Sequence, residues 1–251
     1  DTVPYIKDDS LVILELSSFQ IESFKTHRVS PHFTVITNIF PDHLNYYETM
    51  EQYIQSKKDI ARQQNLNDFL FLKKDDPITN TPGFLKDLEG QIAYFSPDDL
   101  PTGFSPKLQG EYNLWNIAAA LVVAKNLDVD ENKALKVCQD FAGVEFRLQL
   151  IKEVNSIKIY NDSASTMPQS TIEALKSLPG CILICGGMDK NLQFDELAKA
   201  INQYAKVIYF IDGTATDEIK KELSKIASSK TPRNDTSTML SADVIASEAR
   251  Q

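Results

Sequence analysis

Polar side chains near the beginning of the chain adjoin short apolar segments and could together bind a hard divalent cation. Glu15 lies in the apolar run Leu11–Leu16, His43 follows the next apolar run, and Lys57 lies on a segment with helical spacing. A carboxylate oxygen and an imidazole nitrogen are ordinary ligands of divalent metals. A structural role explains each residue alone at least as well: a salt bridge for Glu15, a helix-entry cap for His43 and a solvated position for Lys57.

Two loops in the second half of the chain could bind anions. The segment Asn161–Pro168 places hydroxyl, amide and carboxyl side chains between a predicted strand and a predicted helix that Thr166 could cap. Plain helix capping explains the same residues equally well. In the segment Gly186–Lys190 the glycines let the backbone approach a ligand, and Lys190 could supply a cation to a carboxylate or phosphate. Turns often use Gly-Gly, so this second pattern is weak by itself.

The elements that position these side chains alternate between strands and helices. Leu11–Leu16 and Phe33–Asn38 are short and apolar, which predicts strands buried on both faces of a parallel sheet. The apolar residues of Met50–Gln63 recur near one helical face and predict a helix. The same patterns predict strands over 69–72 and 91–95, and helices over 111–126 and 131–141.

The pattern restarts after Gly143, where we place a domain boundary that separates residues 1–143 from residues 144–251. Strands are predicted over 148–154, 157–160, 181–185 and 207–211, and helices over 169–178, 194–204 and 216–228. This alternation is typical of an α/β fold with a doubly wound parallel sheet, in which ligands bind at the carboxyl ends of the strands. The polar loops described above lie at such strand ends.

Composition narrows the classes of function. The 251 residues carry 26 Lys and Arg against 35 Asp and Glu, a net charge of -9, which repels nucleic-acid phosphates and anionic lipids. No apolar run approaches the roughly 20 residues of a membrane helix, and residues 1–10 lack the basic and then apolar pattern of a signal peptide. We therefore expect a cytoplasmic protein without nucleic-acid or membrane partners. We also expect a monomer, which composition does not decide.

Seven short segments, in order along the chain, resemble the Mur ligase family. They are Leu14-Glu-Leu-Ser-Ser-Phe-Gln20, Asn38-Ile-Phe-Pro-Asp-His-Leu44, Tyr53-Ile-Gln-Ser-Lys57, Tyr112-Asn-Leu-Trp-Asn116, Phe146-Arg147, Asn161-Asp-Ser163 with Thr166, and Gly186-Gly-Met-Asp-Lys190. The first and sixth segments most resemble the branch that adds D-glutamate to UDP-N-acetylmuramoyl-L-alanine. The resemblance implies a P-loop-type central ATPase domain over 1–143, followed by a Rossmann-like domain over 144–251 that binds D-glutamate.

The resemblance also implies an activity, which is ATP-dependent amide formation in peptidoglycan precursor synthesis. The carboxylate of UDP-N-acetylmuramoyl-L-alanine would take the γ-phosphoryl group of ATP as an acyl phosphate, and the amine of D-glutamate would attack it. Because a carboxylate and a triphosphate repel each other, metal ions and cationic groups must neutralise the developing charge.

Individual residues receive roles from the same resemblance. Residues of the catalytic set would hold Mg²⁺: Glu15, His43 and Lys57, the last as a carbamate, which turns an ammonium into an anionic oxygen ligand. Residues of the nucleotide site would bind ATP: Asn113, Asn116, Arg147 and Asp162. Residues of the substrate sites would bind D-glutamate and the UDP-linked substrate: Ser17, Asn38, Thr166 and Lys190.

The sequence departs from the family pattern in several places. No Gly-x-x-x-x-Gly-Lys-[Ser/Thr] phosphate loop is present, and the family would place it upstream of Asp1 together with the domain that holds the UDP group. The closing Ser-Pro-x-Cys-Ala-Ser segment is also absent, Phe146 replaces a usual histidine and Ala164 replaces a frequent lysine. We therefore expect a chain truncated at both ends, with impaired activity when isolated.

Two other functions remain open from the sequence. One is a non-catalytic remnant that binds a nucleotide or an amino acid. The other is a folylpolyglutamate-synthase-like ligase, which shares the architecture but should lack the Ser-Ser-Phe-Gln and Asn-Asp-Ser segments found here.

Overall fold

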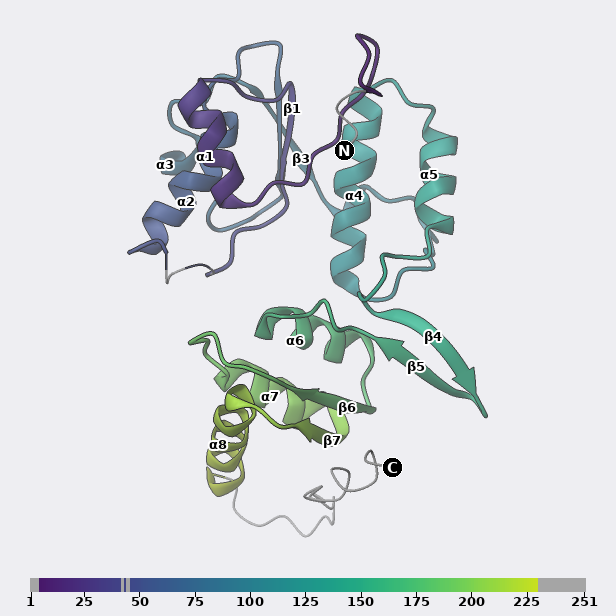
Figure 1. The fold of residues 1–251 in the computed structure, drawn as a ribbon. Coiled ribbons are helices and arrows are strands. Elements are labelled where there is room, and N and C mark those ends of the chain that lie inside the picture. The colour runs from purple at the N-terminus through teal and green to yellow at the C-terminus, as the bar shows by residue number, and fades with distance from the viewer. Residues whose placement is uncertain (1–4, 42, 44–45, 230–251) are drawn as a thin grey trace. The chain divides into compact units, whose positions relative to one another are not determined.

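The computed structural model describes residues 5–41, 43 and 46–229 (Figure 1). The chain divides into two compact units, one formed by Asp1–Phe104 with Trp115–Lys136 and the other by Ser105–Leu114 with Val137–Gln251. Helices α4 (Glu111–Asn126) and α5 (Glu131–Asp140) contribute residues to both units. The assignment of domains to 1–143 and 144–251 stays a prediction.

The first unit is built on a parallel sheet with the strand order β1-β2-β3. Its remaining elements are α1 (Ser18–His27), β1 (Phe33–Ile36), α2 (Met50–Lys58), the 3-10 turn η2 (Asp59–Ala61), β2 (Phe69–Lys73), α3 (Pro82–Leu85), β3 (Gln91–Phe95) and the 3-10 turn η3 (Pro97–Asp99). The central strand β2 is apolar from Phe69 to Leu72, as expected for a strand with both faces covered. Leu70 and Leu72 face a cluster that includes Tyr53 and Phe84, whereas Phe71 faces a second cluster that includes Ala118 of α4.

The strand predicted over Leu11–Leu16 is wrong. Residues 11–17 adopt no regular structure, and the side chains of Leu11, Val12, Ile13 and Leu14 are exposed. A strand of a parallel sheet is stable only when a neighbour satisfies its backbone hydrogen bonds and both faces are covered. This segment pairs with no strand in the described part of the chain, so its apolar composition alone does not make it a strand.

Helix α1 was not expected from the sequence, although its start carries a recognisable signal. Ser17 is the N-cap, and its hydroxyl accepts a hydrogen bond from the Gln20 backbone N–H while the Gln20 side chain accepts one from the Ser17 N–H. This is the capping box, which Ser17-x-x-Gln20 encodes. The helix predicted over Met50–Gln63 is α2, and it tightens into a 3-10 turn after Lys58.

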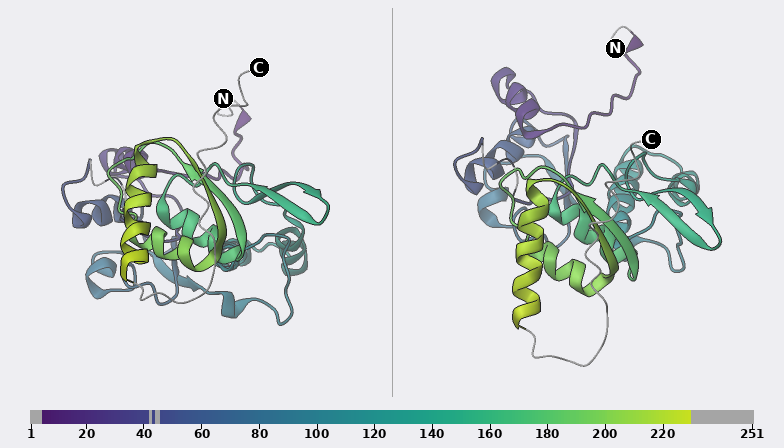
Figure 2. Two further views of the ribbon diagram at one scale, coloured as in Figure 1. Left: turned by 90° about the horizontal axis from the view of Figure 1, so that it is seen from below. Right: turned by 60° about the horizontal axis from the view of Figure 1, so that its bottom comes forward.

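The second unit contains two separate pairs of strands (Figure 2). Its elements beyond α4 and α5 are β4 (Gln149–Val154), β5 (Ile157–Asn161), α6 (Pro168–Ser177), β6 (Cys181–Gly186), α7 (Asp195–Tyr204), β7 (Ala205–Ile211) and α8 (Thr214–Ser229). The predicted parallel register holds for β6 and β7, but β4 and β5 are antiparallel. The two residues that join them, Asn155 and Ser156, have φ of 49° and 64°, which is the backbone of a two-residue hairpin turn.

The core of the second unit lies against one face of the β6–β7 pair. Leu175 of α6, Ile201 of α7 and Ile219 of α8 are almost completely buried in a single cluster. On the opposite face of β6, the side chains of Ile182 and Ile184 are exposed. No helix in the described residues is long and apolar enough to cross a membrane.

Candidate functional site

Two of the residues predicted to bind ATP line one cavity of the second unit. The cavity has a volume of about 120 Å³ and is bordered by Asn113 and Arg147. Other polar side chains in its wall are Lys107, Gln109, Lys158 and Tyr160. Three cationic side chains around one hollow favour an anionic ligand, and an amide beside them can donate to and accept from a heterocycle.

The backbone before α4 fixes the Asn113 side of this cavity. Gly110 has a φ of 94°, and a Cβ at this position would collide with the Ser177 hydroxyl and the Tyr112 ring. The carbonyl of Gly110 accepts a hydrogen bond from the Asn113 N–H at 3.1 Å, and the Asn113 side-chain amide donates to the Gln109 carbonyl at 2.6 Å. Asn116 follows three residues later on the same helix.

Asp162 fixes the Arg147 side of the cavity. Its Oδ1 accepts a hydrogen bond from the Leu148 N–H at 2.8 Å, which ties the end of β5 to the segment that carries Arg147. Burial is the largest cause that raises the pKa of Tyr112, and the nearby Asp162 carboxylate raises this pKa further whereas Arg147 lowers it. Asn113, Arg147 and Asp162 therefore all lie near Tyr112 within one unit.

Two of the three residues predicted to hold Mg²⁺ lie around one aromatic ring in the first unit. Lys57 Nζ lies 5.6 Å from the centroid of the Tyr53 ring, and the His43 ring centroid lies 6.2 Å from the same ring. His43 has a φ of 56° and packs edge-on against Phe19 of α1 at 4.9 Å. The structure thus brings both His43 and Lys57 near the Tyr53 ring.

Glu15 is less constrained than the other two. It is exposed and lies in the irregular segment before α1, two residues before the N-cap Ser17. Among the described residues, no three His, Cys, Asp or Glu side chains form a group that could hold a metal ion. The donor types still suit a hard divalent cation, because a carboxylate, an imidazole and a carbamate leave positions for water and phosphate oxygens.

The residues predicted to bind the substrates occupy varied positions. The Ser17 hydroxyl is engaged in the capping box, and Asn38 is exposed two residues after β1. Thr166 does not cap α6, so this prediction is wrong: the N-cap is Met167, which makes no side-chain capping bond. Lys190 is exposed in the loop after β6.

The loop before Lys190 requires its glycines. Gly186 has a φ of 149°, and a Cβ there would collide with the Ile211 carbonyl oxygen and the Thr216 hydroxyl. A Cβ on Gly213 would likewise collide with the Gly187 carbonyl. Close contact between the ends of β6 and β7 therefore holds the loop that presents Lys190.

Comparisons with known proteins identify relatives of this chain. Residues 5–124 match the model of the Mur ligase middle domain. A relative from Roseiflexus sp. (strain RS-1), named UDP-N-acetylmuramoylalanine--D-glutamate ligase, is 34% identical over 253 residues that cover 89% of this chain and 54% of the relative. The chain is therefore similar to Mur ligases along most of its length. It spans about half the length of the curated relatives it matches.

Solved structures of similar proteins share the α/β fold. The crystal structure of MurF from Acinetobacter baumannii is 17% identical, with a TM-score of 0.67 over 81% of this chain and 51% of that protein. A bifunctional folylpolyglutamate synthase/dihydrofolate synthase from Yersinia pestis CO92 is 16% identical, with a TM-score of 0.57 over 81% of this chain and 57% of that protein. At these identities the likeness concerns the fold alone.

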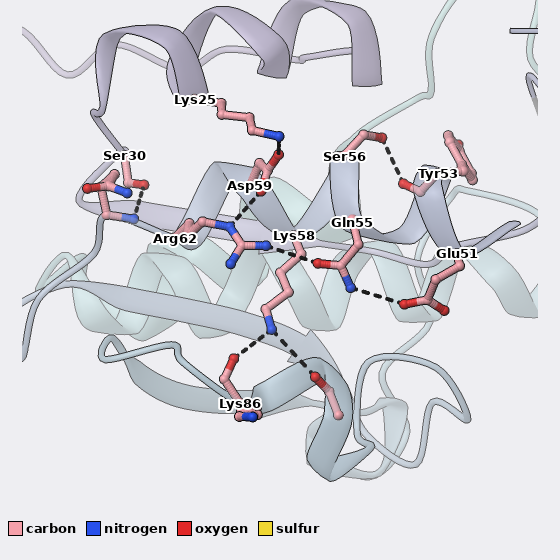
Figure 3. A network of polar contacts seen from close by, with 12 residues as sticks. Lys25, Ser30, Glu51, Tyr53, Gln55, Ser56, Lys58, Asp59, Arg62 and Lys86 are labelled. Atoms are coloured by element: carbon pink, nitrogen blue, oxygen red, sulfur yellow. Dashed lines mark hydrogen bonds and ion pairs between the residues drawn. The ribbon is translucent and has the colours of Figure 1, made fainter. Parts of the chain in front are cut away.

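Two residues beside Lys57 were not predicted from the sequence. Lys58 and Asp59 are buried, with 3% and 5% of their surfaces exposed (Figure 3). Lys58 Nζ donates to the Lys86 carbonyl at 2.6 Å, and burial is the largest cause that lowers its pKa. The sequence Lys57-Lys58-Asp59 is typical of an exposed helix surface. Only the i, i+3 spacing of Asp59 and Arg62 indicates a local ion pair.

Proposed function

We propose that this chain supplies the ATP-binding and D-glutamate-binding parts of a cytoplasmic ligase that adds D-glutamate to UDP-N-acetylmuramoyl-L-alanine. The observation that carries the proposal is that Asn113 and Arg147 line one cavity, and that Asp162 bonds the backbone N–H of Leu148 in its wall, as expected for a nucleotide site. The name and 34% identity of the Roseiflexus relative support D-glutamate as the added amino acid. We further propose that the protein acts as a monomer without membrane or nucleic-acid partners.

The reaction proceeds in two steps. A carboxylate oxygen of UDP-N-acetylmuramoyl-L-alanine attacks the γ-phosphorus of ATP, and the bond to the bridging oxygen breaks to release ADP. The D-glutamate amine then attacks the acyl carbon, phosphate leaves, and a proton is lost from nitrogen as the amide forms. The cationic cavity wall at Arg147 holds the nucleotide against the charge that develops. Lys190 and Thr166 bind D-glutamate, with Lys190 pairing its carboxylate.

The remaining charge is neutralised in the first unit. Mg²⁺, when bound, neutralises phosphate oxygens and polarises the transferred group. Glu15 and His43 would hold it together with Lys57 as a carbamate. The neutral Lys57 amine adds to CO₂ through a new N–C bond, and one proton is released to give the anionic carbamate. Ser17 and Asn38 would lie toward the UDP-linked substrate.

An assay of ADP release tests the proposal. It is measured with ATP and Mg²⁺ in this chain, and in the same chain joined to the upstream half of a curated relative that carries the phosphate loop. We expect release in the joined chain only, and only when both UDP-N-acetylmuramoyl-L-alanine and D-glutamate are present. The phosphate loop supplies backbone amides and a lysine, whose loss is enough to abolish turnover.

The same assay separates the alternatives. Release of ADP with a folate and L-glutamate, and not with the muramoyl substrate, would contradict the proposal in favour of a folylpolyglutamate-synthase-like ligase. Binding of ATP without turnover in the joined chain would support a non-catalytic remnant instead.

A further inference from the structure

Helix α1 adjoins Glu15 and His43, two of the residues proposed to hold the metal in the first unit, and pairs with the segment that follows the third, Lys57. Its N-cap Ser17 follows Glu15 by two residues, and Phe19 in its first turn packs against the His43 ring. At its other end, Lys25 reaches the segment that follows Lys57. The position of α1 relative to α2 therefore relates Glu15 and His43 to Lys57.

A buried carboxylate joins these two helices (Figure 3). Asp59 Oδ2 lies 3.3 Å from Lys25 Nζ of α1, and Asp59 Oδ1 accepts a hydrogen bond from Arg62 Nε at 2.6 Å. Only 6% of the Asp59 side chain is exposed, whereas 67% of the Lys25 side chain is exposed. A carboxylate buried to this extent requires compensating partners. Asp59 has two: Lys25 on α1, and Arg62 directly after η2.

The same carboxylate belongs to a network along α2. Arg62 Nη2 donates to Gln55 Oε1 at 2.9 Å, and Gln55 Nε2 donates to Glu51 Oε1 at 3.2 Å. The neighbouring Lys58 points toward α3, where it bonds the Lys86 carbonyl. Because Lys58 already fixes α2 against α3, the Lys25 contact of Asp59 adds a separate constraint, which is the link to α1.

We propose that Asp59 is a positioning residue that, through Lys25, sets the separation between α1 and Lys57 and thereby pre-organises the divalent-cation site. The inference rests on the proposed function, because it assumes that Glu15, His43 and Lys57 share a cation. Residues that orient metal ligands from outside the coordination sphere commonly change metal affinity when they are replaced.

The test measures Mn²⁺ affinity of the full chain by electron paramagnetic resonance, in bicarbonate and well below the melting temperature of each variant. Asp59→Asn removes the charge that binds Lys25, and we expect the Mn²⁺ dissociation constant to rise about tenfold. Lys25→Met should raise it by a smaller factor without unfolding the chain, because Lys25 is mostly exposed. Lys25→Arg should restore the wild-type value.

Asp76→Asn is the matched control. Asp76 is also a buried carboxylate of the first unit, but its Oδ1 accepts only from nearby groups, the N–H groups of Ile78 and Thr79 and the Thr79 hydroxyl. We expect this variant to lower the melting temperature and leave the Mn²⁺ dissociation constant unchanged.

The outcomes separate the inference from the function on which it rests. Failure of the wild-type chain to bind Mn²⁺ would contradict the proposed metal site, and the inference with it. Normal Mn²⁺ affinity in folded Asp59→Asn and Lys25→Met would overturn the positioning role alone. An equal loss of affinity in Asp76→Asn would also overturn it, because the effect would then follow any destabilisation of this unit.

Discussion

The residues proposed to bind the nucleotide in the second unit and those proposed to bind the metal in the first unit are held in different ways. Asn113 and Asp162 are fixed by hydrogen bonds to the backbone, at the Gln109 carbonyl and the Leu148 N–H. By contrast, His43 packs against aromatic rings, and Glu15 lies in an exposed irregular segment. Hydrogen bonds to the backbone hold the proposed nucleotide residues in place. The proposed metal residues lie near one another, but no metal-binding cluster is formed among the described residues.

The difference follows from the charge of the groups involved. Amide and carboxylate groups that bond the backbone are satisfied whether or not a ligand is present. Glu15 and a carbamate on Lys57 would repel each other without a cation, so the proposed metal site would gain from assembling only when the ion binds. We therefore expect variants in the two units to fail in different ways.

The largest effect is expected at Lys57. In the chain joined to the phosphate loop, Lys57→Ala should lower ADP release by about 100-fold or more, because it removes an anionic group proposed to hold the metal beside the reacting phosphate. Short-chain carboxylates added to the assay should restore part of the rate. Lys74→Ala, which removes an exposed lysine paired with Asp98, is the control and should leave the rate unchanged. Full turnover in Lys57→Ala would contradict the carbamate role.

The next effect is expected at Asp162. Asp162→Ala leaves the Leu148 N–H without its acceptor, which should cost about 1–3 kcal/mol of stability in the second unit. The ATP dissociation constant, measured by calorimetry, should rise about tenfold because the Arg147 segment is no longer fixed. Asp162→Asn keeps an oxygen acceptor, so its ATP dissociation constant should lie between those of the wild type and Asp162→Ala. Equal ATP affinity in all three proteins would show that the cavity does not depend on this bond.

A smaller effect is expected at Gly110. Gly110→Ala forces a Cβ into the Ser177 hydroxyl at a φ of 94° and should cost about 1–3 kcal/mol in a chemical unfolding experiment. Gly180→Ala is matched in backbone conformation, with a φ of 78°, but its Cβ would meet no atom within 4 Å. The excess loss in Gly110→Ala therefore measures the packing of the cavity wall. Identical losses in the two variants would mean that only backbone strain matters.

The smallest effect is a pH dependence in the first unit. The Asn65 N–H and then His32 lower the pKa of Asp68. A lowered folded-state pKa stabilises the fold above the unfolded carboxyl pKa of about 3.9, and this stabilisation is lost as the pH falls through the lowered value. Unfolding midpoints from pH 6 to pH 2 should show this loss in the wild type and less of it in Asp68→Asn. Parallel pH profiles of the wild type and Asp68→Asn would contradict this role of Asp68.

Local patterns in the sequence were sufficient for most elements of the fold. Gln91–Phe95 and Glu111–Asn126 have the predicted bounds, because alternating apolar residues and helical spacing are properties of the segment itself. The Leu11–Leu16 strand failed because its stability depends on a partner elsewhere. The antiparallel β4–β5 hairpin was not predicted, although Asn155 and Ser156 form a two-residue turn, which joins antiparallel and not parallel strands.

The candidate site was less predictable than the fold. Arg147 and Asn113 are far apart in sequence, and only the family resemblance placed both at one nucleotide. Burial of Lys58 and Asp59 could not be foreseen, because their partners Lys86 and Lys25 lie on other elements. Charges next to each other in a sequence indicate a surface unless tertiary contacts supply acceptors and counter-ions for them.

The central claim is that Lys57 carries a carbamate at a divalent-cation site, and ¹³C NMR of the full chain in ¹³C-labelled bicarbonate tests it most directly. We predict a protein-bound carbamate signal that is absent from Lys57→Arg, present in Lys58→Arg and selectively broadened by substoichiometric Mn²⁺. Absence of the signal, or a signal that Mn²⁺ leaves sharp, would contradict the claim.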